Sequence, residues 1–562
     1  MNRTGLFVFG RDYFSPLALS LSSEAGTQAM GIYSIEHVVL LLMILVVALA
    51  AAAKRLKIPY PIVLVVGGLI LSFFPHGPHI ELNPELVFLV ILPPLLFGAA
   101  YVTSWRDFRY NLSSISLLAL GLVSFTVYGV AIATHWILPE FTWSEGLVLG
   151  AVVCTTDAIA ATSIGRRLGL PSRLTGIIEG ESLVNDASGL LALQITVAIV
   201  ITGHTPPLHE RMTLLAYLIG TSVLIGLALA KLAAMLLTKI DDAPVEITVS
   251  IITPYFAYLA AESLHSSGVL ATVACGMYFG HQSSLFFSTR ARLQSAAVWD
   301  TLSFVLNGVV FILIGLQLPY ILSQISDLSL GRLLITGLLI SAVVVVLRLI
   351  WIYPGARAAH WLRVHIQHQT EAMPGPRQLF IAGWTGMRGV VALAAAISLP
   401  KFLADGSPFP QRNVIIFLTF CVIFVTLVVQ GLSLPFFIRK LGLASAEVEN
   451  PEEERARYAM IDAALAYLEA GRDTDSAELA PVYDELIRIQ KHHLNLLPGP
   501  RHAETGYTTG EYERYQELTR SIRALQRAAL LNLRNQNKIN DDVLRRLEQE
   551  LDLFEIRYGD SA

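Results

Sequence analysis

Charged side chains are scarce in this sequence. Asp, Glu, Lys and Arg make up 15% of its 562 residues, whereas an ordinary soluble domain has about 25%. Hydrophobic residues reach 54% and the mean hydropathy is +0.57. This composition excludes a disordered chain and does not fit a soluble globular protein of this size. Long apolar runs recur along most of the chain, so we expect an all-α polytopic membrane protein.

Cysteine is equally rare, which excludes a scaffold built on disulfides. The three cysteines are Cys154, Cys275 and Cys421, and each lies inside an apolar run, where a small buried hydrophobe is the simplest interpretation. The apolar runs also lack a nucleotide-binding loop, a nucleophile–base pair and a cluster of metal ligands. We therefore expect no cofactor, no nucleic-acid partner and no enzyme activity.

The charges that are present concentrate at one end of the chain. Residues 444–562 carry 23 acidic and 15 basic side chains, whereas the first 443 residues carry 21 acidic and 25 basic ones. The last part therefore has the composition of a soluble domain. We predict a short retained leader at 1–35, a transmembrane domain at 36–440 and a cytoplasmic helical domain at 441–562.

The transmembrane domain contains apolar segments of a length that suits membrane-spanning helices. We count thirteen of them: 36–53, 58–75, 86–103, 113–137, 146–164, 176–202, 213–237, 246–264, 268–282, 296–318, 332–354, 378–398 and 413–438. Basic residues between them alternate in number. Sixteen Lys and Arg fall in one set of loops, which begins with Lys54 and ends with Lys440, and six fall in the other. The basic loops should face the cytoplasm, which places the N-terminus outside and the C-terminal domain inside.

An odd number of spans fits two six-helix repeats of opposite orientation joined by one helix, a plan common in secondary transporters. On this plan the fifth span corresponds to the twelfth, and the sixth to the thirteenth. We expect both crossing helices, the fifth and the twelfth, to be broken. Gly383, Gly386 and Gly389 weaken the twelfth span and predict its break, although close packing of small residues would also explain them.

Several ionisable side chains lie inside these spans, where a charge costs at least ~2.5 kcal/mol. They occupy the fifth, sixth, eleventh and twelfth spans and are Asp157, Glu179, Glu181, Asp186, Arg348 and Arg388. Burial disfavours the charged form of a carboxylate unless a cation or a proton neutralises it. Such residues are therefore candidates for an ion pathway, and inert, hydrogen-bonded carboxylates are the alternative for Asp157 and Asp186.

Helical spacing sorts the polar residues of the sixth span into two faces. Ser182 and Asp186 are four residues apart and share one face, whose hydroxyl and carboxylate oxygens suit a hard cation. Glu181 and Asn185 form a second pair one step around the helix. We expect Glu181 to form a structural ion pair with Arg348 or Arg388, although Arg348 could instead extend to the cytoplasmic surface.

Five motifs together resemble the sodium/proton exchangers of the monovalent cation:proton antiporter-1 family, in its bacterial branch. They are Thr-Asp at 156–157, Glu-Ser-Leu-Val-Asn-Asp at 181–186, Met-Arg-Gly-Val-Val-Ala-Leu at 387–393, Leu-Pro-Pro-Leu-Leu-Phe at 92–97 and the run from 304 to 318. The resemblance covers residues 36 to 440. It implies a homodimer in the inner membrane that exchanges a monovalent cation for protons.

The resemblance also implies roles for individual residues. Asp186 would bind the cation and the proton in turn, with Asp157 as the second acid. Thr156 would contribute its backbone oxygen, Ser182 its hydroxyl, and Asn185 would support the site. The remaining implied roles are structural, with Glu181 paired to Arg348 and Arg388 holding the broken helix. Exchange would be electroneutral, because Asn precedes the key Asp in such members.

The chain departs from the family pattern at two positions. An acidic residue often follows the Pro-Pro run, but Gly98 stands here. A proline often follows the aspartate of the fifth span, but Ala158 stands here, so no local helix breaker marks a break in that span. The transported cation is sodium in our first hypothesis, with lithium or potassium as alternatives. A cation- or proton-gated channel or sensor is the alternative from another class of protein.

The C-terminal domain shows apolar residues at helical spacing. Leu544, Leu547, Leu551 and Phe554 repeat at intervals of three and four, as do Leu518, Ile522 and Leu525. This pattern predicts amphipathic helices. They form either a plain helical hairpin or an appendage that contributes a dimer contact or senses pH or a ligand.

Overall fold

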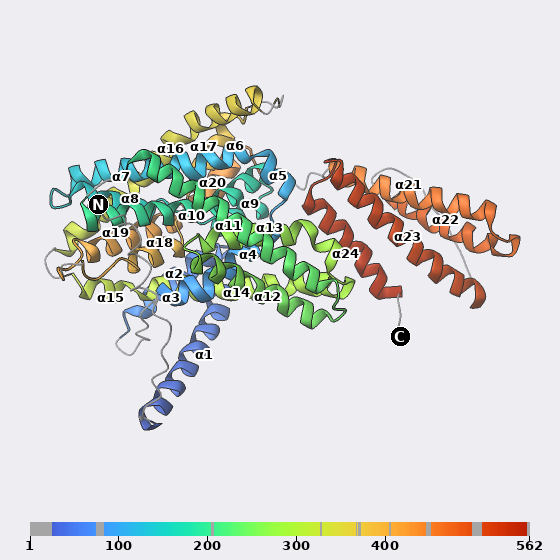
Figure 1. The fold of residues 1–562 in the computed structure, drawn as a ribbon, viewed down its shortest axis with the longest axis horizontal. Coiled ribbons are helices and arrows are strands. Elements are labelled where there is room, and N and C mark those ends of the chain that lie inside the picture. Colours follow the sequence, from blue (N-terminus) through green and yellow to red (C-terminus); the bar gives the residue numbers. More distant parts are fainter. Residues whose placement is uncertain are drawn as a thin grey trace, which may run out of the picture.

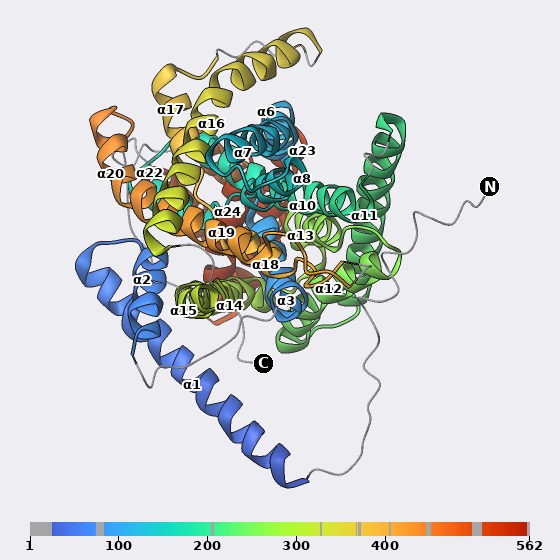
Figure 2. The same cartoon turned by 90° about the vertical axis from the view of Figure 1, so that its left-hand side faces the viewer.

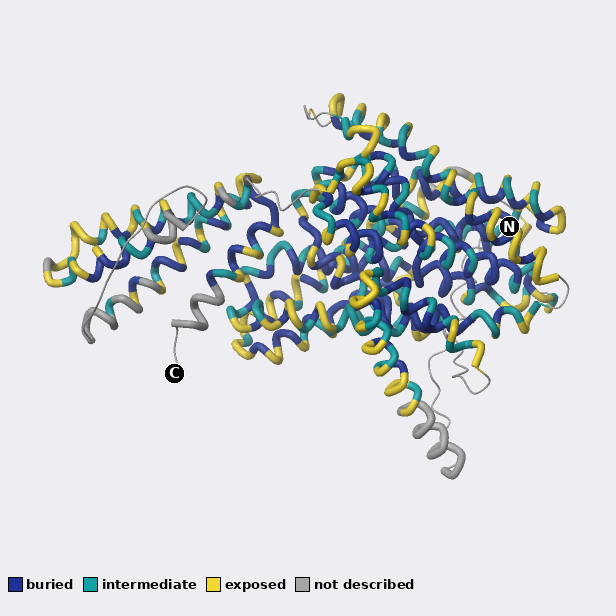
Figure 3. Tube along the Cα trace, turned by 180° about the vertical axis from the view of Figure 1, so that it is seen from behind, coloured by how far each residue is buried: buried dark blue, intermediate teal, exposed yellow. Residues whose placement is uncertain are grey.

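The computed structural model is built from helices. It describes residues 25–74, 84–203, 207–325, 329–366, 368, 373–403, 406–444, 451–496 and 509–558. One isolated β-bridge joins Phe402 to Pro408 in this part of the chain. Buried positions concentrate at the centre of the larger helical body (Figure 3). The predicted all-α class is therefore confirmed.

The helices of the larger body fall into two packed groups. In Figure 2 the first runs from α1 and α2 at the lower left to α11 at the right, and the second occupies the centre and the upper left. We call the first the scaffold group. It consists of α1 (Ala25–Leu56), α2 (Tyr60–Ser72), α3 (Pro84–Leu86) with η2 (Val87–Ile91) and α4 (Leu92–Val102), α11 (Leu208–Leu237), α12 (Ala243–Ser263), α13 (Gly268–Phe286) and α14 (Thr289–Leu316). Within it α14 packs on α2, and α13 packs on both α4 and α11.

We call the second the site group. It consists of α6 (Leu112–Ser116) with η3 (Leu117–Leu122) and α7 (Val123–Ile137), α8 (Trp143–Val153), α9 (Ile159–Arg167), α10 (Ser172–Thr202), α16 (Leu330–His365), α17 (Pro376–Trp384), α18 (Val390–Ile397), and α19 (Arg412–Val425) with η4 (Thr426–Gln430) and α20 (Gly431–Lys440). The short helices α5 (Trp105–Tyr110) and α15 (Leu318–Ser323) connect the two groups.

Nine helices in the described part of the chain are long and apolar enough to cross a membrane. They coincide with nine of the thirteen predicted segments. The other four segments are occupied by shorter helices or by helices of lower hydropathy, namely α2, α8 with α9, α13, and α17 with α18. The chain is a multi-pass membrane protein, and the count of thirteen spans stays a prediction. Helix α1 begins at Ala25, inside the predicted leader, of which residues 1–24 lie outside the described residues.

Two of the predicted spans are each interrupted by a non-helical segment. Residues 154–158 separate α8 from α9, and residues 385–389 separate α17 from α18. The glycine-rich motif marks the second interruption, as predicted. The break expected in the fifth span is also present, although no glycine or proline at 154–158 marks its position.

Four helices follow the larger body: α21 (Pro451–Thr474), α22 (Ala480–Leu496), α23 (Thr509–Asn535) and α24 (Asp541–Tyr558), with the 3-10 turn η5 (Ala477–Leu479). We call them the tail. They form a bundle of their own beside the larger body, with α24 nearest to it (Figure 1). Leu544, Leu547 and Leu551 are buried in its core, as the spacing predicts, whereas Leu525 is exposed.

Candidate functional site

The two interruptions meet inside the site group and are joined through their backbones. The N–H of Asp157 donates to the carbonyl of Met387 over 2.8 Å. This bond links the stretch between α8 and α9 to the stretch between α17 and α18. A backbone that leaves the helix inside a membrane protein needs such partners, because its polar groups otherwise have none.

Ser182 of α10 fixes the first interruption from the side. Its hydroxyl donates to the carbonyl of Thr156 over 2.8 Å and accepts the N–H of Ala158 over 3.3 Å. The carboxylate of Asp157 accepts the N–H of Ile159 at the start of α9 over 2.8 Å. The interruption thus depends on contacts from a distant part of the sequence rather than on a local breaker.

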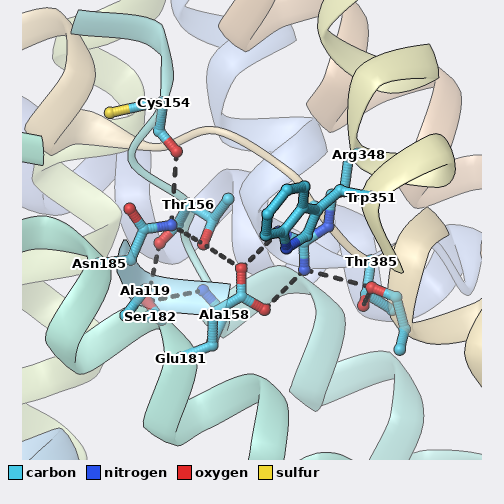
Figure 4. Close-up of polar contacts among 12 residues, drawn as sticks. Ala119, Cys154, Thr156, Ala158, Glu181, Ser182, Asn185, Arg348, Trp351 and Thr385 are labelled. Carbon is cyan, nitrogen blue, oxygen red and sulfur yellow. Dashed lines mark hydrogen bonds and ion pairs between the residues drawn. The ribbon is translucent and has the colours of Figure 1, made fainter. Parts of the chain in front are cut away.

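Asn185 and Thr156 extend this network away from Ser182 (Figure 4). The amide of Asn185 donates to the hydroxyl of Thr156 over 3.0 Å and to the carbonyl of Cys154 over 3.4 Å. The hydroxyl of Thr156 in turn donates to Glu181 over 3.4 Å. Each of these side chains is at least nine-tenths buried.

Glu181 forms a buried ion pair with Arg348 of α16 (Figure 4). The second contact of this bidentate pair joins Nη2 of Arg348 to Oε2 of Glu181 at 2.7 Å, and the same nitrogen donates to the carbonyl of Ala382 in α17 over 3.2 Å. Arg348 is 1% exposed, so it does not reach the surface. Of the two partners that we considered for Glu181, the structure pairs it with Arg348.

Arg388 lies in the second interruption and binds both broken helices. Its Nε donates to the carbonyl of Val153, the last residue of α8, over 2.8 Å, and its Nη1 donates to the carbonyl of Gly386 over 2.6 Å. Its backbone N–H donates to the hydroxyl of Thr426 over 3.1 Å. A cation at the carboxyl end of a helix compensates the partial negative charge that collects there. The contacts to Val153 and Thr426 were not evident from the sequence.

We call the place where the two interruptions meet the crossing. Asp186 lies on α10 beside the crossing and is 7% exposed. Asp157 is close enough for its charge to act on that of Asp186. Among the residues that the structure describes, no hydrogen-bond donor and no cationic side chain pairs with the carboxylate of Asp186. A buried carboxylate of this kind is unstable as a bare anion and calls for a neutralising partner.

Glu179 occupies a different position from the other acids of α10. Its carboxylate pairs with Arg166 of α9 at 2.6 Å, and the guanidinium of Arg166 is largely exposed. Gly98 faces α14, where an added Cβ would lie 3.2 Å from the hydroxyl of Ser303 and 3.3 Å from the ring of Trp299. Neither position belongs to the crossing.

Comparison with known proteins finds relatives for the membrane-spanning part of the chain. The family model for the sodium/hydrogen exchanger transmembrane domain matches residues 41–440. An uncharacterized Na+/H+ exchanger of Mycobacterium tuberculosis is 32% identical, over 90% of this chain and 93% of its own. A sodium, potassium, lithium and rubidium/H+ antiporter of Bacillus subtilis is 34% identical, over 67% of this chain and 57% of its own.

A further relative and a solved structure are also similar to this chain. The low-affinity Na+/H+ antiporter NhaS1 of Synechocystis is 32% identical, over 74% of this chain and 76% of its own. The structure of the sodium proton antiporter MjNhaP1 from Methanocaldococcus jannaschii aligns with a TM-score of 0.57 at 18% identity, over 74% of this chain and all of that one. At this identity the structural match establishes the fold.

Proposed function

The chain belongs to the sodium/hydrogen exchanger family as a bacterial NhaP-like antiporter, and from that premise we propose that it exchanges a monovalent cation for protons at the carboxylate of Asp186. The observation that supports this assignment most is the burial of Asp186 with no partner for its carboxylate among the described residues. A carboxylate committed to a salt bridge, like that of Glu181, is not free to exchange partners.

Competition for one carboxylate couples the two fluxes. Either a proton or a cation neutralises Asp186, and each leaves when the other binds, so no nucleotide is needed. The neutralised carboxylate passes an apolar barrier at much lower cost than the bare anion. An empty site therefore resists crossing, which prevents a leak of either ion.

Oxygen atoms around the crossing complete the proposed cation site. We assign Asp157, the carbonyl of Thr156 and the hydroxyl of Ser182 as further ligands, since hard cations prefer carboxylate, carbonyl and hydroxyl oxygens. Asn185 holds Thr156 in place. Glu181, Arg348 and Arg388 position the broken helices, because their charges are engaged by one another or by backbone carbonyls.

Alternating access follows from the two helix groups. In this proposal the site group moves against the scaffold group and carries Asp186 from one side of the membrane to the other, as in transporters with broken helices at the midplane. We place the protein in the inner membrane as a homodimer with the N-terminus outside and the tail in the cytoplasm. The alternation of basic loops supports this orientation.

Reconstitution of the purified protein tests the function directly. A proton gradient is imposed on proteoliposomes, and the proton flux is measured after addition of sodium, lithium or potassium. We expect sodium to drive the flux, and the name of the Bacillus relatives makes potassium the specific alternative. With the membrane potential clamped at different values, an electroneutral exchanger keeps a constant rate. A current without a counter-ion would instead identify a channel.

A further inference from the structure

The side chain of Gln430 is buried at the end of η4 and takes no part in the hydrogen bonds of the crossing. It is 1% exposed. Neither its amide oxygen nor its amide nitrogen has a hydrogen-bond partner among the residues that the structure describes. The buried side chains of Asn111 and Asn185 differ, since each donates through its amide nitrogen. Burial of an amide without partners costs free energy, so the fold alone does not explain this residue.

The backbone that carries Gln430 is a π-helix, a form that occurs mostly as single turns and often at functional sites. Thr426 is the first residue of this turn, and its hydroxyl accepts the backbone N–H of Arg388 over 3.1 Å. Gln430 is the last residue of η4 and follows Thr426 by about one turn. Its side chain therefore leaves the helix on the side that faces the second interruption.

The residue after Gln430 packs against both helix groups. A Cβ on Gly431 would lie 2.8 Å from Cδ1 of Ile62 in α2 and 3.5 Å from Sδ of Met387 in the second interruption. At the start of α2, the phenol of Tyr60 is close enough for the charge of Asp157 to act on it. The end of η4 thus lies where the scaffold group, the site group and the crossing meet.

The helices around η4 lead from the crossing to one side of the membrane. Helix α20, which continues η4, packs on α9 and on α17. The ends of these three helices away from the crossing carry basic side chains, namely Arg166, Arg167, Arg377, Arg439 and Lys440. In the orientation that we propose, these ends face the cytoplasm. Gln430 follows Thr426 in this direction and so lies between the crossing and the cytoplasm.

The chemistry of an amide suits a position on the route of a cation. A monovalent cation that leaves water needs oxygen atoms in place of its hydration shell, and the carbonyl oxygen of a glutamine is such a ligand. A methionine of similar length would fill the same space without an unpaired polar group. The amide at position 430 is therefore a feature that transport explains and packing does not.

We propose that the amide oxygen of Gln430 is a ligand for the transported monovalent cation on its way between the cytoplasm and Asp186. This role rests on the exchange proposed above and adds a residue to the route of the cation. The amide oxygen replaces one water of the hydration shell before the cation reaches the carboxylates. Because the amide carries no charge and binds no proton, it contributes to cation binding and leaves proton binding at Asp186 unchanged.

Two substitutions separate this role from a structural one. Gln430→Met removes the unpaired amide and keeps the length of the side chain. Asn111→Leu is the matched control, because Asn111 is also buried but its amide donates to the carbonyl of Asp107 over 2.9 Å. The full-length proteins are melted in detergent and reconstituted in proteoliposomes. The initial rate of sodium-driven proton flux is then measured against sodium concentration at several pH values.

We expect Gln430→Met to keep or raise the melting temperature, since it loses an unpaired polar group and no hydrogen bond. Its half-saturating sodium concentration should rise by roughly tenfold, the effect of losing one good ligand, and should vary with pH as in the wild type. Asn111→Leu should show the opposite pattern, with a lower melting temperature and the wild-type half-saturating concentration.

Three results would overturn the role of Gln430. A wild-type half-saturating concentration in Gln430→Met would show that the amide does not bind the cation, even if the maximal rate falls. A melting temperature lowered as in Asn111→Leu would show that the amide has a structural partner. A changed dependence on pH would place Gln430 on the route of the proton. A wild-type protein without any exchange would instead reject the proposed function.

Discussion

The backbone N–H of Asp157 donates to the carbonyl of Met387, 230 residues further along the chain, over 2.8 Å. This bond joins two broken helices at the place where Asp186 is buried. The two interruptions are closely packed at the crossing, since Gly389 lies against the side chain of Asp157. The geometry of the acidic site therefore depends on the absence of a side chain at position 389.

The close approach of Gly389 leads to the first prediction. A Cβ at this position would lie 2.5 Å from the Cβ of Asp157, so Gly389→Ala must displace Asp157 or separate the two interruptions. We expect the exchange rate to fall by roughly tenfold or more, because small displacements at a reacting site have large effects on rate. Proton flux in proteoliposomes measures this change.

Gly176 supplies the control for that prediction. It lies on α10, the helix of Asp186, and an added Cβ would meet nothing within 4 Å. Gly176→Ala should therefore keep the wild-type rate. Equal activity of the two alanine variants would show that the contact between Gly389 and Asp157 is not needed for transport.

The buried pair of Glu181 and Arg348 leads to a prediction about stability. Glu181→Gln leaves the guanidinium of Arg348 buried without its carboxylate, and removal of one partner of a buried pair costs about 3–5 kcal/mol. We expect a lower melting temperature in detergent. The half-saturating sodium concentration should change little, because in our proposal Glu181 positions the helices and does not bind the cation.

A double variant separates the two possible roles of this pair. Glu181→Gln combined with Arg348→Met removes both charges, so it should recover part of the lost melting temperature. A normal melting profile for Glu181→Gln together with a large loss of sodium affinity would contradict us and place Glu181 in the cation site.

Competition between proton and cation leads to a prediction about pH. If both neutralise the same carboxylate, a proton bound at Asp186 must leave before the cation binds. The half-saturating sodium concentration should therefore rise as the pH falls, by about tenfold per pH unit at the acid end of the range. Rates measured between roughly pH 6 and pH 9, a range above the ordinary pKa of an exposed carboxylate, test this. A pH-independent half-saturating concentration would mean that the two ions occupy separate sites.

The sequence predicts those parts of the site that depend on local periodicity. Ser182 and Asp186 share a face because α10 is one continuous helix from Ser172 to Thr202, and four-residue spacing is a property of any such helix. The break that contains Arg388 is likewise predicted from local sequence, because Gly386 and Gly389 lie within it. The helices of the tail are also predicted from local periodicity, and the buried leucines of α24 agree with that prediction.

The remaining features depend on contacts between distant residues and leave no local pattern. The break after Cys154 is held by Ser182 and by the carbonyl of Met387 rather than by a proline. Arg388 reaches back to Val153, and Arg545 binds carbonyls more than 440 residues earlier in the chain. A single sequence reports the residue types at these positions, but it does not report which of them meet.

The exchange activity of Asp186→Asn tests the central claim most directly. The variant keeps the size of the side chain but has no charge to neutralise, and its melting temperature shows whether the protein is folded. We predict that the folded variant, reconstituted in proteoliposomes, shows no sodium-driven proton flux, while the wild type does. Wild-type flux from folded Asp186→Asn would contradict the role of this carboxylate as the shared binding site.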